Sequence, residues 1–184
     1  MATQPDAADV IDQGNTYRCG PFCALQWWSA AGHRTACQQT ITWAYGCAVA
    51  DVQAGASFGQ VLGMVLDWSW RLNVPIRLYG DGYCRDFPTF QQLVRDNWCL
   101  TVGVYEQDLV DPAHPEFGPQ QYFHFLDVNS LVEDPAVYGV PVYTVSDPFH
   151  KYSGEDGVCA VEDMHEAIRH NWDPSIIGIC WRFD

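Results

Sequence analysis

The chain has 184 residues, of which 48% are apolar, 14% aromatic and 17% charged. This composition is too hydrophobic for a disordered chain, contains no apolar run long enough to cross a membrane, and suits one compact domain over residues 1–184. The 23 acidic and 9 basic residues give a formal net charge of −14. Because such a surface repels phosphate backbones and anionic lipid headgroups, we expect neither nucleic acid nor a membrane as a partner.

The start of the chain has neither a basic segment nor an apolar one, so we expect synthesis without a secretory signal. The eight cysteines are irregularly spaced and lack the paired Cys-x-x-Cys of a zinc site, so we expect no metal and no other cofactor. If one thiol is catalytic, at least one other must also be unpaired. A disulfide such as Cys37 with Cys47 is compatible with an oxidising compartment, but the sequence does not fix the pairing.

The first half of the chain is patterned as helices. Cys19-Gly20-Pro21 opens a helix that reaches about residue 31, because proline is tolerated in a first turn and Gly32 supplies a stop. A second helical stretch is predicted over residues 36–45.

Ser57 caps a third, amphipathic helix. Its apolar residues recur every three or four positions and predict a buried face made of Phe58, Val61, Leu62, Val65, Leu66 and Leu72. Two tryptophans of the same helix, Trp68 and Trp70, are interpreted as core or rim residues.

The second half of the chain is patterned mainly as strands. Strands are predicted over residues 75–79, 100–105, 122–129, 141–146 and 176–182, and helices over residues 87–97 and 161–170. Residues 106–121 and 131–139 are interpreted as loops. Helices first, then strands with one late helix, predict an α+β fold in which N-terminal helices pack on a mainly antiparallel sheet.

Cys19 is the candidate nucleophile. A thiol attacks as thiolate, and the N-terminus of a helix with a histidine cation nearby favours that form. Cys23 lies one turn further along the helix and is interpreted as a small buried filler. Gln13, six residues before Cys19, has a spacing from which its amide can donate to a developing oxyanion. The alternative for Cys19 is a disulfide or a core cysteine.

His124 is the candidate base. Of the six histidines, it alone lies inside an apolar strand, in the sequence YFHFLDV, while the others fall in loops, after a helix end or on a helix face. A catalytic base must be held in place by a rigid element, and an apolar strand is such an element. A histidine between two phenylalanines is also compatible with a plain core residue.

The next strand ends in Ser146-Asp147-Pro148 and places a carboxylate one hairpin away from His124. Asp147 is therefore the candidate that orients the imidazole. Asp127 and Asn129 are the alternatives, although both share a strand with His124 and Asp127 is expected to point to the opposite face.

These stretches resemble the papain-like cysteine peptidases typified by bacteriocin-processing enzymes that cut after a double-glycine leader. The similar segments are residues 13–25 (QGNTYRCGPFCAL), 55–66 (GASFGQVLGMVL), the strand beginning His124-Phe125, and 145–148 (VSDP). They follow the family order and extend over nearly the whole chain. The resemblance implies a papain-like fold, with Cys19 as nucleophile, His124 as base, Asp147 as orienter and Gln13 as oxyanion donor.

Three functions are compatible with this pattern. The first is a peptidoglycan-cleaving endopeptidase of phage endolysin type, which is made without a signal peptide, stays cytoplasmic until released and then acts at the bacterial cell wall. The second is a protein-directed enzyme, either a processing peptidase or a deamidating or acylating toxin. The third is an inactive module that binds peptides. For the first two we expect a monomer acting on a peptide substrate.

Overall fold

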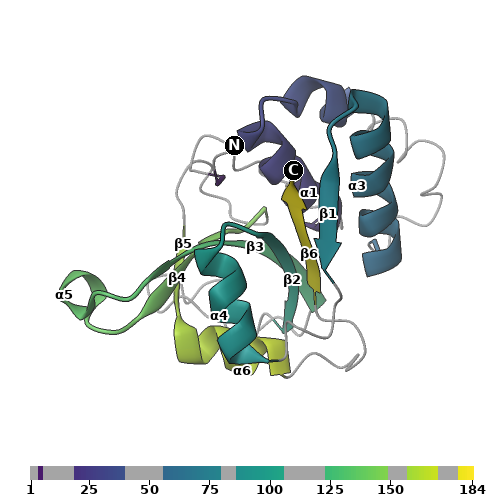
Figure 1. Cartoon of the computed structure of the whole chain (residues 1–184). Helices are drawn as coiled ribbons and strands as arrows, with labels where there is room; N and C mark the ends of the chain where they lie inside the picture. Colours follow the sequence, from purple (N-terminus) through teal and green to yellow (C-terminus); the bar gives the residue numbers. More distant parts are fainter. Residues whose placement is uncertain are drawn as a thin grey trace.

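The structure is a computed structural model that describes residues 4–5, 19–39, 56–79, 86–105, 123–148, 157–169 and 178–184. Within these ranges a six-stranded sheet lies between helices (Figure 1). The strand order is β1-β6-β2-β3-β4-β5, and every neighbouring pair is antiparallel. The predicted α+β class with a mainly antiparallel sheet is confirmed.

The strands are β1 (Ile76–Tyr79), β2 (Cys99–Tyr105), β3 (Phe123–Val132), β4 (Val142–Ser146), β5 (Gly157–Ala160) and β6 (Gly178–Phe183). The helices are α1 (Cys19–Ala30), α3 (Phe58–Leu72), α4 (Phe87–Arg95), α5 (Pro135–Tyr138) and α6 (Val161–Arg169). Residues 34–39 are also helical. The end of the predicted helix over 36–45, and the predicted loop over 106–121, lie outside the described residues.

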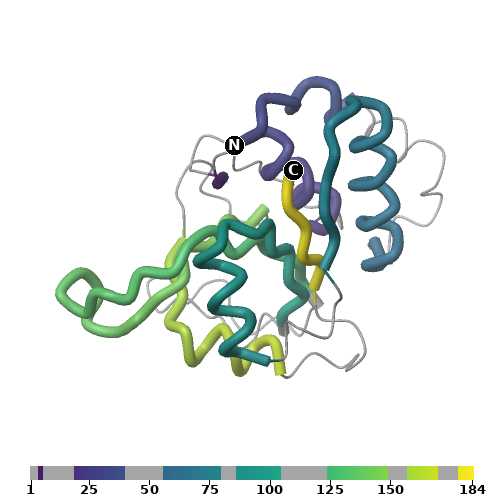
Figure 2. The backbone as a smooth tube through the Cα atoms, viewed as in Figure 1, coloured from purple at the N-terminus to yellow at the C-terminus, as the bar shows by residue number. Residues whose placement is uncertain are grey.

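The sheet separates two apolar cores. On one face α1 and α3 pack against alternate residues of the central strands, including Phe125, Ile179 and Trp181. On the other face α4 and α6 cover Leu126, Val128 and their neighbours. The N-terminal helices therefore pack on the sheet as predicted, while the two later helices cover the opposite face (Figure 2).

The start of α1 is pressed closely against its neighbours. A Cβ atom placed on Gly20 would lie 2.6 Å from Val61 Cγ2 of α3 and 3.2 Å from the Phe125 ring of β3. Only glycine allows this approach. The helix ends as predicted, with Gly32 in the left-handed region at φ +85°.

The helix α3 begins with the predicted Ser57 cap. The Ser57 hydroxyl accepts a hydrogen bond from the backbone N–H of Gln60, and Gln60 Oε1 accepts one from the backbone N–H of Ser57. The buried face is Phe58, Val61, Val65 and Trp68. Leu66 was predicted to be buried but is 44% exposed, and Trp70, predicted at the core or rim, is 80% exposed. Both lie on the solvent side of α3. The apolar residues of this helix cover a wider face than the part that packs against the rest of the protein.

The hairpin of β3 and β4 is longer than predicted. The strand β3 continues to Val132, and the short helix α5 follows, so residues 131–139 are not the plain loop expected. The Asp134 side chain caps α5 by accepting from the Ala136 amide, and Gly139 ends it at φ +80°. Figures 1 and 2 show this hairpin projecting from the body of the fold.

Candidate active site

The predicted nucleophile opens α1. Cys19 is the first residue of the helix and its thiol is free and partly exposed. Unpaired amides and the helix dipole favour an anion at such a position. Gly20 lets the start of the helix approach α3 and β3. The buried Pro21 fits the first helical turn, where a backbone N–H would have no partner within the helix. The local sequence therefore sets the thiol at the surface of a tightly packed helix end.

His124 lies on β3, and Asp147 directly follows the neighbouring strand β4. In the β3–β4 pairing Asp127 faces Ser146, so one further step places Asp147 opposite Leu126, two residues from His124. His124 Nε2 lies 2.6 Å from Asp147 Oδ1. The imidazole is nearly buried, with 6% of its side chain exposed, whereas the carboxylate is 23% exposed. The predicted base and orienter are therefore directly bonded.

The thiol of Cys19 hydrogen-bonds the imidazole as well. Since Nε2 is occupied by Asp147, Nδ1 is the nitrogen that remains for the sulfur. Burial by itself would lower the pKa of His124. The Asp147 carboxylate and the Cys19 side chain outweigh burial and raise the pKa of His124 well above its ordinary value. The site thus favours an imidazolium between a carboxylate and a sulfur.

The two alternative orienters are bonded elsewhere. Asp127 accepts hydrogen bonds from Gln26 and Thr101, and the Asn129 amide donates to Ser146 Oγ at 2.6 Å. Neither side chain contacts the imidazole in these bonds. The geometry therefore selects Asp147 over Asp127 and Asn129 as the partner of His124.

Burial distinguishes Cys19 from most other described cysteines. Cys23 is fully buried one turn along α1, and burial, reinforced by the charge of Asp127, raises its thiol pKa well above the ordinary value. Burial likewise raises the thiol pKa of Cys37 and Cys159 to about 12 and that of Cys99 well above normal. These thiols stay protonated near neutral pH. None of the six cysteines in the described part of the chain forms a disulfide.

His165 shows what an ordinary core histidine looks like in the same fold. It stacks on Phe87, and its Nε2 lies 3.0 Å from the Tyr143 hydroxyl. Burial, together with the nearby Arg169, lowers the pKa of His165 to about 4, so its ring is neutral. The opposite shift at His124 comes from its acidic partner.

Gln13, the predicted oxyanion donor, and the Cys47 thiol lie outside the described residues. Within the described ranges, no group of three or more His, Cys, Asp or Glu side chains is arranged to hold a metal ion. In the same part of the chain, no helix is both long and apolar enough to cross a membrane.

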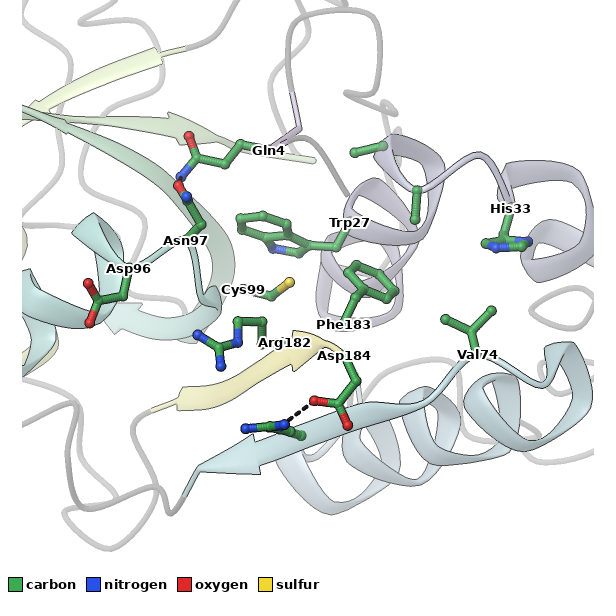
Figure 3. Close-up of a pocket in the computed structure, with 13 residues that line it drawn as sticks. Gln4, Trp27, His33, Val74, Asp96, Asn97, Cys99, Arg182, Phe183 and Asp184 are labelled. Carbon is green, nitrogen blue, oxygen red and sulfur yellow. Dashed lines mark hydrogen bonds and ion pairs between the residues drawn. The ribbon is translucent and has the colours of Figure 1, made fainter. Parts of the chain in front are cut away.

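A cavity of about 720 Å³ lies at the other end of α1 (Figure 3). Trp27 and His33 line it on one side, and Arg182 and Asp184 line it on the other. Arg77 of β1 is also among the lining residues. Arg77 is ion-paired with Asp184. The cavity contains none of Cys19, His124 or Asp147, so it is separate from the candidate active site.

No protein-family model matches the sequence, and no curated protein matches it either.

Proposed function

We propose that this chain is a cysteine peptidase with a papain-like catalytic site. The observation that carries the proposal is the continuous contact from the Cys19 thiol through the His124 imidazole to the Asp147 carboxylate. A nucleophile bonded to a base, with the base bonded to an orienter, is the geometry expected of an activated thiol. The position of Cys19 at a helix N-terminus supports the same role.

In the proposed reaction the Cys19 thiolate attacks the carbonyl carbon of a peptide bond and forms a C–S bond. The carbonyl oxygen becomes an oxyanion, for which Gln13 is the proposed donor. The His124 imidazolium gives its proton to the amine as the C–N bond breaks. Neutral His124 then takes a proton from water, which attacks the thioester, releases the acid and restores the thiolate. Asp147 stabilises the imidazolium at the start and end of this cycle.

The proposed substrate class is the short peptide of bacterial peptidoglycan, which similar papain-like domains of phage endolysins cut. A protein substrate is the main alternative, because the same chemistry serves a processing peptidase. The same catalytic chemistry would cut either substrate. Only an assay with each substrate can therefore distinguish the two functions.

The test is to incubate the protein with purified cell wall and with unfolded protein, and to analyse the released fragments by mass spectrometry. Cys19→Ala should abolish turnover. Cys23→Ala is the matched control from the same helix; it should stay within a few-fold of wild type and cost about 1–3 kcal/mol of stability. Cleavage of protein but not of cell wall would move the proposal to a protein-directed peptidase. Equal loss of turnover in both folded variants would remove Cys19 from the role of nucleophile.

Reactivity of the thiol separates both readings from an inactive peptide-binding module. Iodoacetamide should modify Cys19 faster at pH 6 than it modifies an ordinary thiol, because thiolate is the reactive form. A Cys19 that reacts no faster than free cysteine would favour the inactive module.

A further inference from the structure

A carboxyl group lies buried beneath the candidate active site. Asp127 is on β3, three residues from His124, and none of its surface is exposed. Its two oxygens accept hydrogen bonds from different elements: Gln26 Nε2 donates to Oδ2 at 2.9 Å and Thr101 Oγ1 donates to Oδ1 at 2.6 Å. The Cys23 thiol also hydrogen-bonds Asp127. We call Asp127, Gln26 and Thr101 the Asp127 clamp.

The clamp connects the three elements around the site. Thr101 faces Asp127 in the β2–β3 pairing, so its hydroxyl fixes the carboxyl group within the sheet. Gln26 and Cys23 come from α1, seven and four residues after Cys19. Spacings of four and seven place all three residues on one face of the helix, over a length of about 10 Å. The face of α1 that begins with Cys19 is thus bonded to the strand that carries His124.

Burial of this group is costly. Removing a carboxyl group from water disfavours its charge, and none of its hydrogen-bond partners among the described residues is cationic. Burial raises the pKa of Asp127 to about 7, against the opposing effect of its hydrogen bonds. An apolar side chain would fill the same place more cheaply. The advantage of the carboxyl group is direction, because two hydrogen bonds fix a geometry that apolar contact does not.

The rest of the α1 contact with this sheet face is apolar. Leu25, Trp28, Phe125 and Trp181 belong to the same core. Apolar packing tolerates small sliding and rotation, whereas a nucleophile and its base need their geometry within fractions of an ångström. Gln26 is the buried polar side chain of α1 that reaches Asp127.

From this arrangement we infer that Asp127 is a positioning residue for the proposed reaction: it fixes where α1 lies on β3, and so the separation of the Cys19 thiol from the His124 imidazole. This role rests on the proposed function. Asp127 does not contact the reacting atoms, and its effect passes through α1.

The experiment measures the rate at which iodoacetamide modifies Cys19 between pH 5 and 9, followed by mass spectrometry of the Cys19 peptide so that the other thiols do not interfere. Asp127→Ala removes the clamp and should slow the reaction at pH 6 by roughly 100-fold, because the thiol loses its imidazole partner. Gln26→Met keeps the volume of the side chain, removes the Gln26 hydrogen bond to Asp127 while leaving Cys23 in place, and should act in the same direction. It keeps the test valid if Asp127→Ala does not fold.

Two variants separate positioning from general stability. Asp127→Asn retains an acceptor for Gln26 and can donate to Thr101 Oγ1, so it should restore the reaction to within about threefold of wild type. Tyr143→Phe removes the buried hydrogen bond to His165 on the opposite face of the sheet. It should lower the urea midpoint and leave the pH profile of Cys19 unchanged.

The outcomes are distinct. If wild-type Cys19 reacts like an ordinary thiol, the proposed function fails and the positioning role fails with it. If wild type is reactive and the folded Asp127→Ala and Gln26→Met variants match it, only the positioning role fails. The positioning role fails equally if Tyr143→Phe slows Cys19 as much as Asp127→Ala does.

Discussion

His124 Nε2 lies 2.6 Å from Asp147 Oδ1, across the open end of the β3–β4 hairpin. The two residues are 23 positions apart in the chain and come together only through the register of that hairpin. The carboxylate is the group that raises the pKa of His124 most, against the effect of burial. The protonation of His124 therefore depends mainly on this contact, with a smaller contribution from Cys19.

Asp147→Ala should narrow the pH range of the proposed peptidase activity. Activity of a thiolate–imidazolium pair is bell-shaped, and its basic limb reports loss of the imidazolium. Because Asp147 raises the pKa of His124, its removal should move the basic limb to lower pH and reduce kcat/KM about 100-fold or more. Profiles of kcat/KM against pH for both proteins test this. An unchanged basic limb would make another residue the orienter, with Asn129 the first to examine.

Gln13→Ala should lower the maximal rate and leave both limbs in place. An amide does not titrate, and the loss of one oxyanion donor typically costs about 100- to 1,000-fold in kcat. Both kcat and kcat/KM are measured against pH, so that the limbs of the kcat/KM profile can be compared with those of Asp147→Ala. Limbs that move as far as in Asp147→Ala would assign Gln13 to the protonation of the site and not to the oxyanion.

Local patterns predicted the elements whose signals are local. The Ser57 and Gln60 cap, the Gly32 stop and the apolar strands needed only spacing and residue type, and the structure has each of them. The short elements α5 and β5 were missed. Each is four residues long, and β5 contains Gly157 and an exposed Val158, so neither has a recognisable sequence pattern. The strand β5 forms by pairing with β4, and α5 lies in the connection between β3 and β4.

The candidate site likewise has residues that local patterns predict and residues that they do not. Cys19 at a helix start, His124 in an apolar strand and Asp147 at the next strand end could be predicted, because the chemistry requires those residue types in that setting. The role of Asp127 could not, since the sequence places it beside His124 and suggests a competing orienter. Its actual partners, Gln26 and Thr101, depend on how α1 crosses the sheet, and this is a property of tertiary packing.

Gly20→Ala should damage both stability and activity. The added Cβ would lie 2.6 Å from Val61 Cγ2, so α1 must shift or Val61 must move, at a cost of about 1–3 kcal/mol. The shift falls next to Cys19, so kcat should fall as well. The double variant Gly20→Ala with Val61→Ala relieves the contact and should recover part of the activity. Urea unfolding and kcat of both variants provide the test.

Gly63→Ala is the matched control: the residue is inside α3, and a Cβ placed there has no atom within 4 Å other than those of its chain neighbours and the adjacent helix backbone. Replacing glycine by alanine in an exposed helix should leave activity unchanged and raise stability by up to about 1 kcal/mol. If Gly20→Ala behaved like Gly63→Ala, close approach would not be the reason for glycine at position 20.

Asp127 should make the protein less stable as the pH rises from about 4 to about 7. In the unfolded chain an aspartate releases its proton near pH 3.9, whereas burial raises the pKa of Asp127 to about 7 in the folded protein. Between these values the folded state binds the extra proton, so the free energy of unfolding falls as pH increases, by at most about 1.4 kcal/mol per pH unit. His124 adds a loss at higher pH, because its raised pKa stabilises the fold below about 6.5 and the effect disappears as the folded imidazolium deprotonates.

Asp127→Asn removes the first of these two contributions and keeps the second. The difference between variant and wild type in the free energy of unfolding should therefore grow in favour of the variant from pH 5 to pH 8, as measured by urea unfolding at several pH values. Glu133→Gln is the control: this carboxylate is exposed and paired with Arg95, which lowers its pKa, so its contribution is already complete above about pH 4.5 and is weakened by solvent. Its stability difference from wild type should stay constant over the same range. Parallel curves for wild type and Asp127→Asn would mean that Asp127 is ionised in the folded protein across this range, and the clamp would then hold a charged carboxylate.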